Sequence, residues 1–200
     1  MFADLLRQRL RGIVEVSPEV ADRLFAHYEL LVRWNKSLNL TSIESLETAV
    51  ERHYCESAFL ALHLPPDQGL KICDVGSGAG FPGIPVAVFR PDCSVVLIES
   101  HQRKAVFLRE ATRGMPNVRI LAKRAEEVAE KFDRLISRAV SYADLVKPAR
   151  KLAGAANLLT GEEAPPEALG FQWDSPIALP WGKKRFLRTG TIVSRETEHE

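Results

Sequence analysis

The chain has 200 residues, of which 46% are hydrophobic and 26% are charged. This composition is typical of a globular domain and excludes a disordered or collagen-like chain. The formal net charge of +1 is too small to predict nucleic-acid binding by itself. We expect neither a secretion signal nor a membrane span, because charged residues interrupt the first segment. Widely spaced cysteines favour buried free thiols and a reducing, cytoplasmic location: Cys55, Cys73 and Cys93.

The first 65 residues are expected to be helical. Ser17 and Pro18 predict a helix start, because the hydroxyl can cap free N–H groups and proline is tolerated in the first turn. Apolar side chains then recur at helical spacing over 20–34, and this pattern stops over 35–41. A second helix is predicted over 46–62, ahead of a pair of prolines.

Strands and helices alternate from residue 70 onward. We predict strands at 70–75, 94–99, 118–121, 133–137 and 155–159, helices at 102–113, 125–131 and 142–152, and two further strands near 172–178 and 185–194. Such alternation is typical of right-handed βαβ units. It predicts an α/β fold in which a mostly parallel, twisted sheet carries helices on both faces. The helical part would form a cap at 1–65, and a Rossmann-like domain would follow at 66–200.

Basic side chains gather in four groups along the chain. Each group is either a solvated face or part of a surface that binds phosphates, and the sequence leaves both interpretations open. The groups are Arg7, Arg9 and Arg11; Arg103, Lys104, Arg109 and Arg113; Lys147, Arg150 and Lys151; and Lys183, Lys184, Arg185 and Arg188.

A glycine-rich turn, D-V-G-S-G-A-G-F-P-G, follows the first expected strand. Asp74 precedes three glycines, Gly76, Gly78 and Gly80, which can take positive φ and let a ligand lie against the backbone. A dinucleotide-binding fingerprint would need glycine where Phe81 stands. The spacing is instead similar to the S-adenosylmethionine site of Rossmann-like methyltransferases. The alternative is a strand-to-helix turn without a ligand.

The second expected strand ends on an acidic residue, Glu99, about 20 residues beyond the glycine turn. A carboxylate at this place can accept hydrogen bonds from both ribose hydroxyls of an adenosine cofactor. It does not separate NAD from S-adenosylmethionine, and a solvated strand end is the alternative.

Four motifs together resemble one family. They are W-N-K-S-L-N-L-T at 34–41, R-H at 52–53, D-V-G-S-G-A-G-F-P-G-I-P at 74–85 and I-S-R-A at 136–139. The chain resembles the bacterial small-subunit ribosomal RNA guanine-N7 methyltransferases, also called the glucose-inhibited division protein B family. This resemblance covers about the first 160 residues.

The resemblance implies a class I methyltransferase domain that transfers a methyl group from S-adenosylmethionine to N7 of a guanine in the 530 loop of 16S rRNA. It also implies 16S rRNA or the small ribosomal subunit as partner. We further expect no metal, no membrane association and a monomer. Arg138 is the expected catalytic residue. The expected cofactor-binding residues are Asp74, Gly76, Gly78, Gly80, Phe81, Glu99, Ala125, Glu126 and Arg138.

Two positions depart from the family pattern. Thr160 replaces the lysine of A-L-K-G, which would lower RNA affinity or move that task elsewhere if the lysine contacts RNA. Glu56 stands where the family often has aspartate, a milder change.

Methylation of guanine N7 requires no general base, because this atom carries a lone pair and no proton. Positioning and exclusion of water are then the expected sources of catalysis, with Arg138 aligning cofactor and base. A structural ion pair is the alternative for Arg138. His53 and Trp34 are expected to be structural more than catalytic.

Two other functions have less support from the sequence. A nicotinamide oxidoreductase lacks support, since Phe81 breaks the dinucleotide fingerprint and no Tyr-x-x-x-Lys pair is evident. A noncatalytic RNA-binding protein on a methyltransferase fold is supported only by Thr160.

Overall fold

The N-terminal helices begin where capping predicts. The computed structural model describes residues 1–42 and 45–192 and opens with α1 (Phe2–Arg9) and α2 (Pro18–Leu38). Ser17 Oγ accepts the N–H of Val20 at 3.3 Å, which caps α2. The predicted end of this helix before residue 35 is wrong by about one turn. Asn35 stays helical because its side-chain amide bonds both the N–H and the C=O of Thr41, at 2.9 Å each, and thereby fixes the following loop.

The second predicted helix is a continuous helical run with a widened middle. It consists of α3 (Leu46–Ala49), the π-helical turn η1 (Val50–Cys55) and α4 (Glu56–Leu62). The outer bounds agree with the prediction, but hydrophobic periodicity gave no sign of the π-helical turn. Such turns frequently occur at functional sites.

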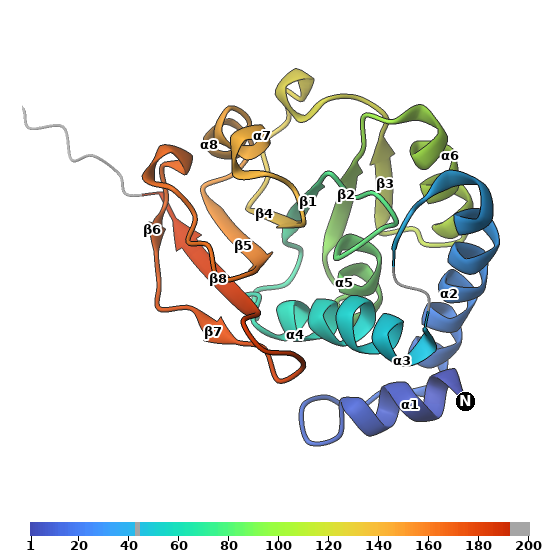
Figure 1. Ribbon diagram of the computed structural model, residues 1–200. Helices are drawn as coiled ribbons and strands as arrows, with labels where there is room; N and C mark the ends of the chain where they lie inside the picture. Colours follow the sequence, from blue (N-terminus) through green and yellow to red (C-terminus); the bar gives the residue numbers. More distant parts are fainter. Residues whose placement is uncertain (43–44, 193–200) are drawn as a thin grey trace, which may run out of the picture.

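An eight-stranded sheet forms the centre of the molecule (Figure 1). Its order is β3-β2-β1-β4-β5-β8-β6, with β7 paired to β8. Strands β1 to β5 are parallel and β8 runs antiparallel to β5, so the predicted mostly parallel α/β sheet is confirmed. The strands are β1 (Lys71–Val75), β2 (Ser94–Ile98), β3 (Val118–Leu121), β4 (Arg134–Arg138), β5 (Ala155–Thr160), β6 (Gln172–Trp173), β7 (Ile177–Ala178) and β8 (Phe186–Thr191).

The helices predicted at 102–113 and 125–131 are shorter in the structure, and the one predicted at 142–152 is divided. The connecting helical segments are α5 (Gly83–Phe89), α6 (Gln102–Ala111), the 3₁₀ turns η2 (Ala125–Glu127) and η3 (Glu167–Leu169), α7 (Tyr142–Val146) and α8 (Ala149–Leu152). The single helix predicted at 142–152 is divided because Pro148 lacks the N–H that would continue it. Pro176 likewise separates β6 from β7, where one strand was expected. The predicted strand residues 193–194 lie outside the described residues.

Each face of the sheet has its own hydrophobic cluster, because alternate residues of a strand point to opposite faces. Ile72 and Leu97 join the cluster that contains the N-terminal helices, α5 and α6, whereas Cys73 and Val96 join the one under α7 and α8. Trp34 packs on the first cluster as expected of a core residue. The division of the chain at residue 65 stays a prediction, and both of its parts contribute to this first cluster.

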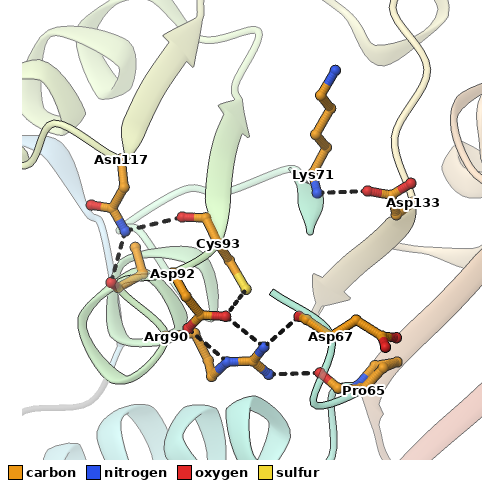
Figure 2. A network of polar contacts seen from close by, with 9 residues as sticks. Pro65, Asp67, Lys71, Arg90, Asp92, Cys93, Asn117 and Asp133 are labelled. Atoms are coloured by element: carbon orange, nitrogen blue, oxygen red, sulfur yellow. Dashed lines mark hydrogen bonds and ion pairs between the residues drawn. The ribbon is translucent and has the colours of Figure 1, made fainter. Parts of the chain in front are cut away.

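Arg90 organises a polar network at the amino ends of the strands (Figure 2). Its guanidinium pairs with both carboxylate oxygens of Asp92, at 3.0 and 2.8 Å. It also donates to the carbonyl oxygens of Pro65 and Asp67, at 2.9 and 3.1 Å. Ligands of parallel α/β sheets bind at the opposite, carboxyl edge. We therefore assign this network to stability.

Replacing Arg90 should destabilise the fold. Arg90→Ala leaves carbonyl groups without their charged donor, and the free energy of unfolding should fall by about 1–3 kcal/mol. Urea unfolding measures this change. The matched control is the exposed Arg109, where Arg109→Ala should stay within about 0.5 kcal/mol of the wild type. Equal stability of the two variants would contradict the structural role of the network.

Candidate functional site

Glu99 fixes the glycine-rich turn at the carboxyl ends of β1 and β2. One carboxylate oxygen accepts the N–H of Gly78 at 2.9 Å, and the other accepts the N–H of His101 at 2.7 Å. The N–H of Gly76 also donates to the carbonyl oxygen of Ile98, at 2.9 Å. The turn is thus bonded to the neighbouring strand. Each oxygen of Glu99 keeps a further lone pair for a ligand.

The glycines of the turn are needed by the protein itself as well as by a ligand. Gly76, Gly78 and Gly80 have φ of 70°, 54° and 89°, which is strained for residues with a side chain. A Cβ at Gly76 would lie 2.4 Å from Val140 Cγ2, and one at Gly80 would lie 2.4 Å from Ile84 Cδ1. The positive φ was predicted from the sequence, whereas the close packing of these two glycines on other side chains was not. Gly78 is the one of the three whose Cβ would meet only a distant atom, at 3.8 Å.

Asp74 lies beneath the turn and is fully buried. Its Oδ2 accepts the N–H of Gly83 at 3.0 Å. Its Oδ1 is buried and has no hydrogen-bond partner among the described residues. Burial raises the pKa of Asp74 to about 7. Asp74 does not line the cleft described below, and its predicted contact with a cofactor stays a prediction.

One cleft brings together four of the predicted cofactor residues. Gly76, Glu99, Ala125 and Glu126 line it, from the ends of β1 and β2 and from η2. Its remaining lining residues are Val75, Ile98, Ser100, Lys123, Arg124, Val140 and Asp144. A backbone without Cβ, a carboxylate at the strand end and a mixed polar and apolar wall fit an adenosine ligand.

The Phe81 side chain does not line this cleft. It is 3% exposed and stacks on the His53 imidazole, with ring centroids 4.4 Å apart and an interplanar angle of 13°. The Arg138 guanidinium carbon lies 5.1 Å from the Phe81 ring centroid. Phe81 therefore packs as a core residue, and its predicted contact with a cofactor stays a prediction.

Arg138 and His53 form a hydrogen-bonded chain. Arg138 Nη1 donates to the Arg52 carbonyl oxygen, and Nη2 donates to His53 Nδ1 at 2.6 Å. Because arginine can only donate, His53 carries its proton on Nε2 and donates it to Thr41 Oγ1 at 2.9 Å. Burial, reinforced by the Arg138 charge, lowers the pKa of His53 to about 2. His53 is a neutral bridge, in line with the structural role expected for it.

A second cleft adjoins the first. Ala139 lines the second cleft and Val140 lines the first, so the two share a wall at the end of β4. Arg138 faces the second cleft. The residues lining this second cleft are Asn39, Leu40, Thr41, Ser42, Arg52, His53, Arg138, Ala139 and Arg185.

His27 is a site residue that sequence reasoning missed. Its Nε2 donates to the Ala79 carbonyl oxygen at 3.0 Å, and its Nδ1 accepts from the Tyr54 hydroxyl at 3.0 Å. Burial lowers the pKa of His27 to about 4, so the imidazole is neutral. The signal was present, because His27 shares the apolar stripe of Leu24 and Leu31. Through this contact α2 supports the glycine turn.

Both departures from the family pattern find a partner. Thr160 Oγ1 accepts from Arg188 Nε at 3.0 Å, so a guanidinium from β8 lies at the end of β5. Glu56 is fully buried and pairs with Arg185. Neither departure touches the glycine turn.

Residues 1–42 and 45–192, the part of the chain that the structure describes, contain neither a membrane-spanning helix nor a metal-binding cluster. None of the helices there combines the length and the apolar character that crossing a membrane requires. The same residues contain no group of three or more histidine, cysteine, aspartate or glutamate side chains arranged to hold a metal ion.

Residues 21–162 match the family described as GidB: rRNA small subunit methyltransferase G. A ribosomal RNA small subunit methyltransferase G of Nitrosomonas europaea is 42% identical over 143 residues, covering 68% of this chain and 65% of that protein. The ribosomal RNA small subunit methyltransferase G of Pelotomaculum thermopropionicum is 35% identical over 182 residues, covering 84% of this chain and 76% of that protein. The match thus spans just under two thirds of the Nitrosomonas relative.

Solved structures share the fold at low sequence identity. A SAM-dependent methyltransferase from Aquifex aeolicus has a TM-score of 0.57 and 16% identity, over 73% of this chain and 93% of that chain. Aeropyrum pernix fibrillarin, in complex with natively bound S-adenosylmethionine, has a TM-score of 0.53 and 16% identity, over 68% and 73%. The chain is similar to both in its Rossmann-like sheet.

The raised pKa of Asp74 predicts a specific pH dependence of stability. The folded carboxyl keeps its proton up to about pH 7, whereas the unfolded one loses it near pH 4, so its stabilising contribution is lost as pH rises through this window. Relative to Asp74→Asn, which has no group to ionise, the free energy of unfolding of the wild type should fall by roughly 2–4 kcal/mol between about pH 4 and 8. Urea unfolding of both proteins across this range measures the difference. A difference that stays constant with pH would contradict the assignment.

Proposed function

The chain belongs to the rRNA small subunit methyltransferase G family, and on this premise we propose that it methylates N7 of a guanine in the 530 loop of 16S rRNA, with S-adenosylmethionine as methyl donor. The observation that carries this proposal is the cleft in which Glu99, Gly76 and Glu126 meet at the carboxyl edge of the sheet. Relatives that are 42% and 35% identical are named ribosomal RNA small subunit methyltransferase G, which supports an rRNA substrate.

Each side of the cleft has a role toward the cofactor. Glu99 accepts from the ribose hydroxyls with the lone pairs that the turn leaves free. Gly76 lets the methionine part lie against the backbone, and Ala125 and Glu126 flank the adenine. When bound, S-adenosylmethionine supplies a methyl group already activated by the positive sulfur. Asp74 does not line the cleft and acts toward the cofactor through the turn, because its Oδ2 holds the N–H of Gly83.

The acceptor side needs alignment and no proton transfer. Guanine N7 has no proton to remove, and His53 is neutral and bonded on both nitrogens. Arg138 is held from two sides at the wall between the clefts, where it would align the base with the methyl group. Catalysis then follows from near-attack positioning and exclusion of water.

The partner is 16S rRNA or the small ribosomal subunit, and the protein acts as a monomer in the cytoplasm. Three free, buried thiols support a reducing compartment: Cys55, Cys73 and Cys93. Calorimetric titration with S-adenosylmethionine and with NAD distinguishes this function from an oxidoreductase. Binding of S-adenosylmethionine without methyl transfer to 16S rRNA would favour a noncatalytic RNA-binding role.

Glu99→Gln should weaken the affinity for S-adenosylmethionine by about 10- to 100-fold, because a charged acceptor of the ribose hydroxyls is lost, at about 1.5–3 kcal/mol. Calorimetry measures this affinity, and urea unfolding shows whether the turn still folds. Glu127→Gln is the matched control, since Glu127 is exposed beside the cleft without lining it. Equal affinities of the two folded variants would contradict the assignment of Glu99.

The rate of methyl transfer should show no ionisation of His53. Single-turnover rates with saturating RNA, from about pH 6 to 8.5, should have the same pH profile in the wild type and in His53→Asn. The variant is expected to be slower throughout, because Arg138 loses an acceptor that holds it. An ionisation near pH 6.5 that disappears in His53→Asn would make His53 a catalytic base.

A further inference from the structure

The second cleft is dominated by arginines that share one buried carboxylate. Glu56 is fully buried, and Arg185 binds it in a bidentate manner, Nε to Oε1 at 3.1 Å and Nη2 to Oε2 at 2.6 Å. Arg52 Nε lies 3.2 Å from Oε1 of the same carboxylate. Arg138 lines the same cleft. Two guanidinium groups thus pair with one carboxylate, Arg138 adds a third to the lining, and no acidic side chain among the described residues lines the cleft, which keeps an excess of positive charge.

The shared carboxylate orients both arginines and leaves donors for a ligand. Among the described residues, no hydrogen bond engages Nη1 of Arg185, nor either terminal nitrogen of Arg52. The side chains of Arg52 and Arg185 are 39% and 19% exposed, so both reach solvent from a fixed base. Guanidinium groups that are preorganised in this way suit bidentate recognition of phosphate oxygens.

The backbone around the cleft is unusual as well. Among the described residues, positive φ outside glycine occurs at Asn39 (47°), Ala139 (59°) and Lys184 (61°). The first two line the cleft and the third precedes Arg185. Arg52 itself lies on the π-helical turn η1. Backbone strain of this kind collects at ligand sites.

Resting on the proposed function, we infer that this second cleft binds a backbone phosphate of the RNA substrate next to the target base, with Arg52 and Arg185 as the phosphate ligands and Glu56 as the residue that positions them. Ala139 lines this cleft and the next residue, Val140, lines the cleft proposed for the cofactor, so a phosphate held here places its nucleotide near the methyl donor. Arg185 lies outside the segment 21–162 that matches the family. The turn between β7 and β8 thereby becomes part of the substrate site.

RNA binding measured against salt tests this inference. The probe is an RNA fragment containing the 530 loop, titrated by fluorescence anisotropy over roughly 50–200 mM salt. Arg52→Gln and Arg185→Gln should each weaken binding by about tenfold at low salt and reduce the slope of log affinity against log salt by about 0.7–0.9. Lys184→Gln is the matched control, because Lys184 is 69% exposed and pairs with Glu162. It should change the affinity by less than about twofold.

Two readouts keep the outcomes separate. Arg185→Gln removes a partner of the buried Glu56 and could unfold the protein. In that case the test uses Arg52→Gln, because Arg52 is half-exposed, and the double variant Glu56→Gln/Arg185→Gln, which removes the unpaired charge. Arginine variants that match Lys184→Gln in affinity and salt slope would overturn the inference. Calorimetry with S-adenosylmethionine tests the proposed function independently. If the wild-type protein does not bind this cofactor, the proposed function is contradicted, whatever the RNA result. If the protein binds the cofactor but the arginine variants bind RNA as the wild type does, only the phosphate site is contradicted.

Discussion

The carboxylate of Glu99 ties the glycine-rich turn to the end of β2, and the cleft proposed for the cofactor depends on this contact. A turn that follows β1 with three glycines at positive φ has little intrinsic preference for a single conformation. The hydrogen bond from the Gly78 N–H to Glu99 ties this turn to the end of β2, and Asp74 Oδ2 accepts the N–H of Gly83 at the start of α5. The same carboxylate faces the cleft proposed for the cofactor. Loop geometry and ligand recognition therefore depend on one side chain.

The N-terminal helices complete the site from the other side of the turn. His27 of α2 donates to the carbonyl oxygen of Ala79 within the turn, and His53 of η1 stacks on Phe81, directly after the turn. Both imidazoles are kept neutral by burial, so they act as fixed hydrogen-bonding and packing groups. The helical segment thus holds Arg138 through His53 and contributes Arg52 and His53 to the lining of the second cleft.

The sequence predicted the sheet and the residues at its strand ends, because these depend on local patterns. Short apolar runs located the strands, and the spacing between the glycines and Glu99 predicted residues of the cleft proposed for the cofactor. The contacts that complete the site could not be predicted, because they join residues far apart in the chain. Arg185 and Glu56 are 129 positions apart, and no local pattern pairs them. The packing of Gly76 on Val140 is likewise a tertiary constraint.

The most direct test of this account is mass analysis of 16S rRNA from cells that lack the protein, before and after incubation with the purified chain and S-adenosylmethionine. The account predicts that one guanine in the 530 loop is unmethylated before incubation and carries a methyl group on N7 afterwards. No methyl transfer, or transfer only to another atom or another region of the RNA, would contradict it.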